Sequence, residues 1–277
     1  MFEEMKTRHL FGLTLLSLIV AGIAAVVYSV SEAVIDIFLQ LIIYVIVPVL
    51  FFSFHFRRQK ISVRNVIFTT GVGPWLPSLA GLVLLSVGFS LSVFWFQLYL
   101  LMPISPGLVE FFLEPLPLPE NRLYLAFTLI SIAIIGPIAE EFIFRGVLLK
   151  RMMLKTSMWG GIIISSLLFG ILHADIIGAT LFGVVASLLY LKTSNLFVPI
   201  LLHIFNNSLA VIWMYVAPDW PKWGVIESSD IYAEALPNAI LLVISSIIMA
   251  WAVMRLSKGL RNRKHQVEEN VIEEPLL

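Results

Sequence analysis

The feature that most constrains this chain is a series of long apolar runs that are almost free of charge. A helix that crosses a bilayer needs about 20 consecutive, mostly apolar residues. Runs of that kind lie at 10–30, 34–54, 77–101, 123–150, 159–175, 176–191, 197–217 and 235–254. Only 13% of the residues are charged, against about a quarter in a soluble domain. The sequence therefore predicts an all-α, polytopic membrane protein with about eight transmembrane helices.

The basic residues predict how these helices are oriented. All but two of the 18 Lys and Arg residues lie before the first run, in alternate loops or after the last run, and the exceptions are Arg122 and Lys222. Because cytoplasmic loops are enriched in Lys and Arg, we expect both termini in the cytosol. The run 10–30 is too long for the apolar part of a signal peptide. We therefore interpret it as a retained first helix.

The composition also limits the domain organisation and the possible binding partners of the chain. We expect a single integral membrane domain over 1–277, with a solvated cytosolic tail at 257–277 that begins basic and ends acidic. The formal net charge is zero, so nothing indicates nucleic acid as a partner. The chain contains no cysteine, which excludes a thiol nucleophile, a disulfide and a thiolate metal site.

Polar residues inside the predicted helices are the candidates for function. A charged side chain in a bilayer costs at least ~2.5–3.5 kcal/mol on insertion scales. A charged residue inside a membrane span is therefore a candidate for function. The candidates are Glu140, Glu141, Arg145, His173, His203, Asn206 and Asn207. They occur in the fourth, fifth and seventh runs only, which predicts a single polar site.

The fourth and fifth runs are expected to form an antiparallel hairpin. Their turn is predicted near Lys155–Met158, in a basic stretch that must reach water. Glu140 and His173 are equidistant from this turn, so they should lie level with each other. In the same register Phe144 should lie level with Phe169. The hairpin therefore predicts that the first two polar segments meet.

The depth of the third segment agrees with this hairpin. With a cytosolic boundary near Lys150, Glu140 lies about 14 Å deep at 1.5 Å of rise per residue. His203 follows Ser194, at the start of the seventh run, by nine residues and so reaches a similar depth. We therefore predict one intramembrane site that is accessible from the cytosolic side.

Spacing along each helix suggests roles. Glu141 and Arg145 are an i,i+4 pair with the acid first, the favourable order, and the pair is either structural or functional. Glu140 lies about 100° further around the helix, so it is less well paired and suits a general base. His203 and Asn207 share a face and offer donors to an oxyanion, although polar groups also hydrogen-bond between packed membrane helices.

The dipeptide Gly136-Pro137 precedes the two glutamates. Proline lacks a backbone N–H and bends a helix. The bend could direct the glutamates into the bundle, or it could be one of the kinks that membrane helices tolerate.

Three motifs now stand in order along the chain. They are an E-E-x-x-x-R at 140–145, an F-x-x-x-H at 169–173 and an H-x-x-x-N at 203–207, and the stretch Leu196–Ile200 precedes the third. This pattern resembles the CPBP (CAAX protease and bacteriocin-processing) family of intramembrane proteases, which includes the Ras-converting type II CAAX prenyl endopeptidase. The resemblance covers a motif-bearing core at about 123–217, and the first 120 residues do not carry it.

The resemblance implies an intramembrane endopeptidase that removes the C-terminal tripeptide from prenylated CaaX proteins anchored in the lipid bilayer. It implies catalytic roles for Glu140, His173, His203 and Asn207 and supporting roles for Glu141, Arg145 and Phe169. Glu140 with His173 would activate the attacking water, and His203 with Asn207 would stabilise the tetrahedral oxyanion. Glu141 and Arg145 would hold the site together or bind the peptide.

The sequence allows an alternative both for the cofactor and for the class of protein. Two His and one Glu can form a catalytic zinc site, so Glu140, His173 and His203 would be the ligands if a metal is bound. The chain has no H-E-x-x-H motif, and we expect no metal or other cofactor. The same polar set could also serve proton-linked transport, or non-enzymatic membrane binding as in bacteriocin immunity. Transporters usually contain repeats with paired broken helices, and none is visible, so we expect an enzyme.

Overall fold

The computed structural model describes residues 2–67, 71–114, 119–217 and 221–260. Within these ranges the chain forms helices and no strand, as expected. The α-helices are α1 (Thr7–Val27), α2 (Glu32–Leu41), α3 (Val47–Gln59), α4 (Arg64–Ile67), α5 (Leu76–Leu101), α6 (Pro106–Leu113), α7 (Arg122–Ile130), α8 (Gly136–Glu141), α9 (Lys150–Lys155), α10 (Met158–Gly170), α11 (Ile176–Thr193), α12 (Phe197–Val216), α13 (Asp230–Ala233) and α14 (Ala235–Ser257). Short 3-10 turns are η1 (Phe2–Glu4) and η3 (Gly73–Trp75), and π-helical turns are η2 (Ile42–Ile46), η4 (Ser131–Ile135) and η5 (Phe142–Leu149). Most of the predicted tail lies outside the described residues.

Seven continuous helical segments of the described chain are long and apolar enough to cross a membrane. They are Thr7–Val27, Glu32–Gln59, Gly73–Leu101, Arg122–Lys155, Ile176–Thr193, Phe197–Met214 and Ala235–Ser257. The chain is therefore an integral multi-pass membrane protein. The predicted span 159–175 differs, because α10 is an apolar helix of only 13 residues. It ends at Gly170, and residues 171–175 form a turn in which the Asp175 side chain caps α11.

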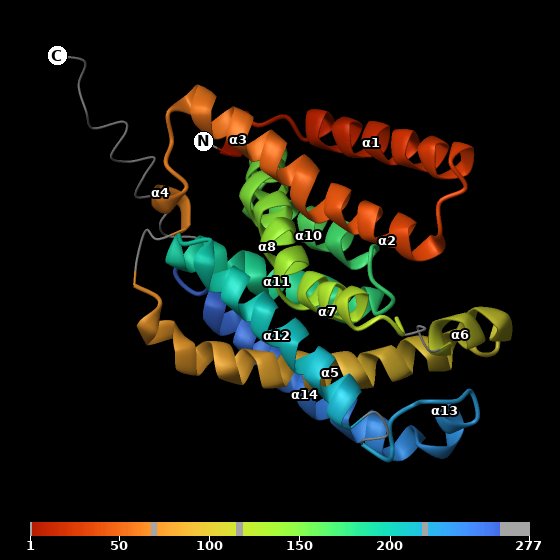
Figure 1. The fold of residues 1–277 in the computed structure, drawn as a ribbon. Coiled ribbons are helices and arrows are strands. Elements are labelled where there is room, and N and C mark those ends of the chain that lie inside the picture. Colours follow the sequence, from red (N-terminus) through yellow and green to blue (C-terminus); the bar gives the residue numbers. More distant parts are fainter. Residues whose placement is uncertain (1, 68–70, 115–118, 218–220, 261–277) are drawn as a thin grey trace.

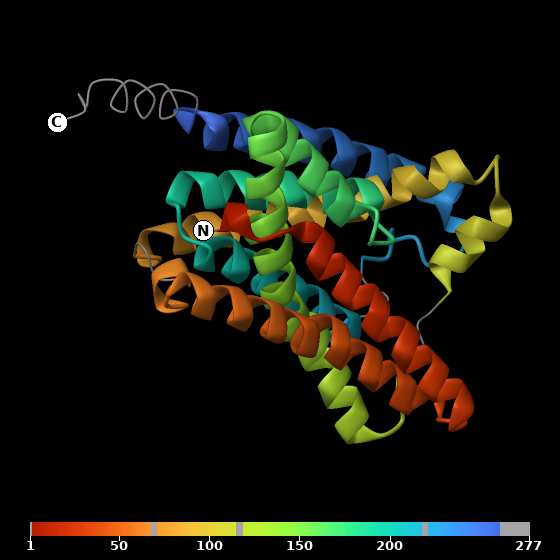
Figure 2. The same cartoon turned by 90° about the horizontal axis from the view of Figure 1, so that it is seen from above.

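The helices lie in layers that place the three motif helices at the centre (Figures 1 and 2). On one side, α1 packs against α2 and α3. The long segment α7–α9 comes next and contacts η2 and α12. Beyond it, α11 and α12 pack on α5, and α5 lies beside α14 on the opposite side of the bundle. The motif-bearing helices are thus covered from both sides by helices that carry no motif.

Two contacts join basic segments at one end of this bundle. The Arg151 guanidinium donates a hydrogen bond to the carbonyl of Glu3, with 2.7 Å between Nη1 and O. The Lys192 ammonium group donates to the carbonyl of Arg255 at 2.9 Å. Segments that the charge pattern assigns to the cytosol therefore meet in space. Which side of the membrane they face stays a prediction.

The hairpin of α10 and α11 is held by a close approach at Gly170. A Cβ added there would overlap the hydroxyl of Thr180 and lie 2.6 Å from the carbonyl oxygen of Ile176. We expect Gly170→Ala to lower the free energy of unfolding by about 1–3 kcal/mol, because overpacking forces the helices apart. Thermal unfolding of the detergent-solubilised protein measures this change.

The matched control for this substitution is Gly81→Ala on α5. A Cβ at Gly81 meets nothing within 4 Å, so this variant should keep its stability or gain about 0.5–1 kcal/mol from the better helix former. Equal melting temperatures for the two alanine variants would show that α10 and α11 can separate at Gly170 without loss.

Candidate functional site

The two glutamates are oriented by irregular turns in the long segment α7–α9. The turn η4 ends immediately before Gly136-Pro137, so the helix widens where proline cannot donate a hydrogen bond. A second π-helical turn, η5, begins directly after Glu141. Such turns occur often at functional sites. Between these two turns, Glu141 is fully buried and Glu140 is 19% exposed.

Glu141 is the centre of a buried polar cluster. Its Oε1 accepts a hydrogen bond from Arg145 Nη1 at 2.8 Å, and the two side chains are 0% and 1% exposed. The same oxygen lies 2.9 Å from Nδ1 of His203, which donates to it. The Arg145 guanidinium also lies over the Phe169 ring, 4.4 Å from its centroid. The predicted ion pair is therefore present, and it extends to both other motifs.

His203 contacts both glutamates through its two ring nitrogens. While Nδ1 faces Glu141, Nε2 lies 3.8 Å from Oε2 of Glu140. The ring is 2% exposed and packs against Phe182, with 5.0 Å between the centroids. A carboxylate bonded to one nitrogen fixes the orientation of an imidazole and leaves the other nitrogen free for chemistry. His203 is thus held with Nε2 directed toward Glu140.

His173 also packs against the Phe169 ring. The two rings are tilted by 38° with 4.4 Å between their centroids, and the Phe169 centroid is 5.6 Å from that of the His203 ring. The Nδ1 atom of His173 also lies 2.9 Å from the carbonyl oxygen of Phe169. In the described part of the chain His173 makes no close polar contact with Glu140. The predicted register is nevertheless confirmed where Phe144 meets Phe169, at 5.2 Å between ring centroids.

Asn207 connects α12 to the irregular turn η4. Its Nδ2 donates to the carbonyl oxygen of Ile132 at 3.0 Å, which satisfies an acceptor that the π-helical turn exposes. The neighbouring Asn206 donates to Asn207 Oδ1 at 3.5 Å. The Oδ1 atom of Asn206 is buried without a hydrogen-bond partner among the described residues. Asn206 is therefore a further candidate that the motif pattern did not select.

A cavity of about 180 Å³ lies beside the two imidazoles and the two asparagines. Its walls include Ser90, His173, Asp175, His203, Asn206 and Asn207. Its polar walls and its size suit water. Ser90 and Asp175 were missed by motif reasoning, although a serine in an apolar helix and an aspartate beside His173 are visible signals. The cavity makes water available next to both imidazoles.

The described residues do not form a metal centre. No group of three or more His, Asp or Glu side chains in them is placed to hold a metal ion. Glu140, His173 and His203, the ligands considered for zinc, are not such a group in the described residues. We therefore derive no step through a metal.

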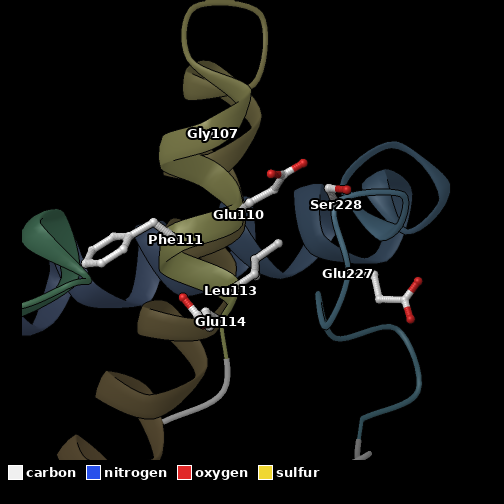
Figure 3. Close-up of a pocket in the computed structure, with 7 residues that line it drawn as sticks. All are labelled: Gly107, Glu110, Phe111, Leu113, Glu114, Glu227 and Ser228. Atoms are coloured by element: carbon white, nitrogen blue, oxygen red, sulfur yellow. The ribbon is translucent and has the colours of Figure 1, made fainter.

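Other hollows in the described part of the chain are lined by residues outside the polar cluster. An apolar groove of about 330 Å³ runs between η2–α3 and α8, and its walls include Tyr44, Phe52, Ile138, Ala139 and Phe142. An acidic pocket of about 520 Å³ lies between α6 and the loop before α13. Figure 3 shows Glu110 on α6, Glu114 directly after it and Glu227 on the facing loop. None of the motif residues lines this acidic pocket.

Comparison with known proteins finds similarity over the motif-bearing segment. Residues 122–209 match the family model described as type II CAAX prenyl endopeptidase Rce1-like. The chain is 39% identical over 83 residues to the putative membrane peptidase YdiL of Bacillus subtilis, covering 29% of this chain and 34% of that protein. It is 32% identical over 115 residues to the membrane-embedded CAAX protease MroQ of Staphylococcus aureus, covering 38% of this chain and 47% of that protein.

A third relative is matched over a longer stretch. An uncharacterized 24.3 kDa protein of Escherichia coli is 31% identical over 160 residues, covering 55% of this chain and 66% of that protein. The first two matches span about a third to a half of the relatives' lengths. No solved structure matches the chain. The family resemblance read from the three motifs is confirmed, and it is carried by α7 to α12.

Proposed function

We propose, on the premise that residues 122–209 are Rce1-like, that this chain is a membrane-embedded endopeptidase that uses Glu140 to activate water. The observation that carries the proposal is the position of His203, whose two nitrogens face Glu141 and Glu140 beside a cavity that also contains His173. A base, a fixed imidazole and room for water are the parts that peptide hydrolysis requires.

The distance between Glu140 and His203 supports a bridging water. At 3.8 Å, Oε2 and Nε2 are too far apart for a direct hydrogen bond. A water at about 2.8 Å from each fits between them. In the proposed reaction Glu140 takes a proton from this water as its oxygen attacks the scissile carbonyl. The peptide C–N bond then breaks, and the proton passes to the departing amine.

The oxyanion would be stabilised from the cavity side. Sequence reasoning paired His173 with Glu140 and assigned the oxyanion to His203 and Asn207. The contact between His203 and Glu140 favours an exchange of the two imidazoles, with His203 at the water and His173 at the oxyanion. Because Nδ1 of His173 donates to the carbonyl of Phe169, this role requires His173 to carry a second proton on Nε2. Asn207 keeps its predicted place, since its side chain lines the same cavity. Donors aimed at the developing charge are worth about 10²–10³-fold in rate each.

The apolar groove supports a lipid-modified substrate. Ile138 and Ala139 line it and directly precede Glu140 in α8, so the groove and the base share one helix. An isoprenoid chain in this groove would place the adjoining peptide near Glu140. The proposed substrate is therefore a prenylated CaaX protein, cleaved after the prenylated cysteine, and the proposed access is from the cytosolic side where the basic segments meet.

The test is release of the tripeptide from a farnesylated CaaX peptide by the purified protein in detergent. We expect release from the farnesylated peptide, much less from the same peptide without the lipid, and no change with a strong chelator. Equal cleavage of both peptides would reject prenyl recognition. Loss with chelator and recovery with zinc would overturn the metal-free mechanism. No release from either peptide would reject the CaaX substrate.

A further inference from the structure

The turn that carries His173 is held by a helix outside the family-matched segment. Helix α10 ends at Gly170, and residues 171–175 lead to α11 without regular helical structure. Gln97 on α5 bonds this turn with both ends of its amide. Its Nε2 donates to the carbonyl of Ala174 at 2.8 Å, and its Oε1 accepts from the N–H of Ile176 at 3.2 Å. Gln97 is buried, so these two bonds are shielded from solvent.

Ser90 also bonds residues 171–175. It lies on α5, seven residues before Gln97. Its hydroxyl donates a hydrogen bond to Oδ2 of Asp175, whose Oδ1 accepts from the N–H of Gly178 at 2.9 Å. Gly178 leaves space for this arrangement, because a Cβ there would collide with the Asp175 carboxylate and lie 2.6 Å from the Ser90 hydroxyl. Ser90 and Asp175 also line the cavity that contains His173.

His173 is held from two directions. Toward α10, its ring packs on Phe169, its Nδ1 bonds the carbonyl of Phe169 at 2.9 Å, and its backbone N–H bonds the carbonyl of Gly170 at 2.9 Å. Toward α11, the backbone of the turn is fixed at 174–176 by Gln97 and Asp175, so where the ring points depends on this turn as well. A displacement of about 1 Å at a catalytic group can cost 10²-fold in rate.

We infer that Ser90 and Gln97 of α5 are positioning residues for His173, acting through Asp175 and the backbone of residues 174–176. The inference rests on the proposed function for the role of His173 in catalysis, but the placement of the ring is a property of the fold and can be measured by itself. It extends the site beyond the motif-bearing segment to a helix that the family match does not include.

The test compares Ser90→Ala with a matched variant on the same helix, Ser92→Ala. Ser92 is fully buried and bonds the carbonyls of Gly88 and Phe89 and the hydroxyl of Ser245, so it contacts neither the turn nor the cavity. The first readout is the rate at which diethylpyrocarbonate modifies His173, followed by peptide mapping. The second is kcat and KM for the farnesylated peptide.

We expect Ser90→Ala to speed modification of His173 severalfold and to lower kcat by up to about 10²-fold with little change in KM. Ser92→Ala should change neither value. Gln97→Ala should repeat the effect of Ser90→Ala.

The two readouts separate failure of this inference from failure of the proposed function. Equal His173 modification in Ser90→Ala, Ser92→Ala and the wild type would overturn the positioning role, whatever the activity. Faster modification in Ser90→Ala, with no cleavage of the peptide by any form, would retain the positioning role and reject the proposed substrate. Equal melting temperatures of the two serine variants show that neither readout reflects unfolding.

Discussion

Replacement of Glu140 by glutamine is expected to lower the rate of peptide cleavage by about 10²–10⁴-fold, the usual contribution of a general base. Glutamine keeps the size of the side chain and its place at the edge of the cluster, but it cannot take a proton from water. Because Glu140 is partly exposed and has only the 3.8 Å approach to His203, its loss should leave stability nearly unchanged. Tripeptide release and thermal unfolding measure the two effects on the same sample.

The matched control is Glu110→Gln on α6. Glu110 lies in the acidic pocket with Glu114 and Glu227, which no motif residue lines (Figure 3). This substitution removes the same charge and should leave cleavage at the wild-type rate. Full activity of Glu140→Gln would contradict the proposed base. In that case loss of activity in Glu141→Gln would move the role to the neighbouring carboxylate.

The contacts that could be predicted from the sequence are those with local or symmetric spacing. Glu141 and Arg145 form the expected pair because residues four apart share a helix face. Phe144 meets Phe169 because both are equally far from a hairpin turn that basic residues mark. The apolar runs likewise predicted the spans, since length and hydropathy are properties of contiguous residues. In each case the relevant distance along the chain is visible before folding.

The contacts that could not be predicted depend on irregular backbone and on tertiary packing. A π-helical turn shifts the face of each residue that follows it, and no motif marked η4 or η5. His203 reaches Glu141 across 62 positions of sequence, so which of its nitrogens faces which glutamate follows only from packing. Gln97 and Ser90 lie in a helix without a motif. Their role becomes visible only when the turn that packs against this helix is known.

Replacement of Arg145 by alanine is expected to destabilise the protein by about 3–5 kcal/mol, because it leaves the carboxylate of Glu141 buried without its cation. The guanidinium also covers the Phe169 ring, so its removal opens a space in the core. The double variant Glu141→Gln with Arg145→Met should recover part of this loss, since it removes both charges and fills the space. Thermal or denaturant unfolding in detergent measures all three proteins.

The matched control for this prediction is Arg255→Ala. The Arg255 side chain is exposed and lies over Trp251, 5.2 Å from the ring centroid, so its loss should change stability by at most about 0.5 kcal/mol. If Arg145→Ala were as stable as Arg255→Ala, the buried pair would not hold the site together. Glu141 would then be free to share the role of base with Glu140. Its burial would then be explained by His203, which bonds the same carboxylate oxygen.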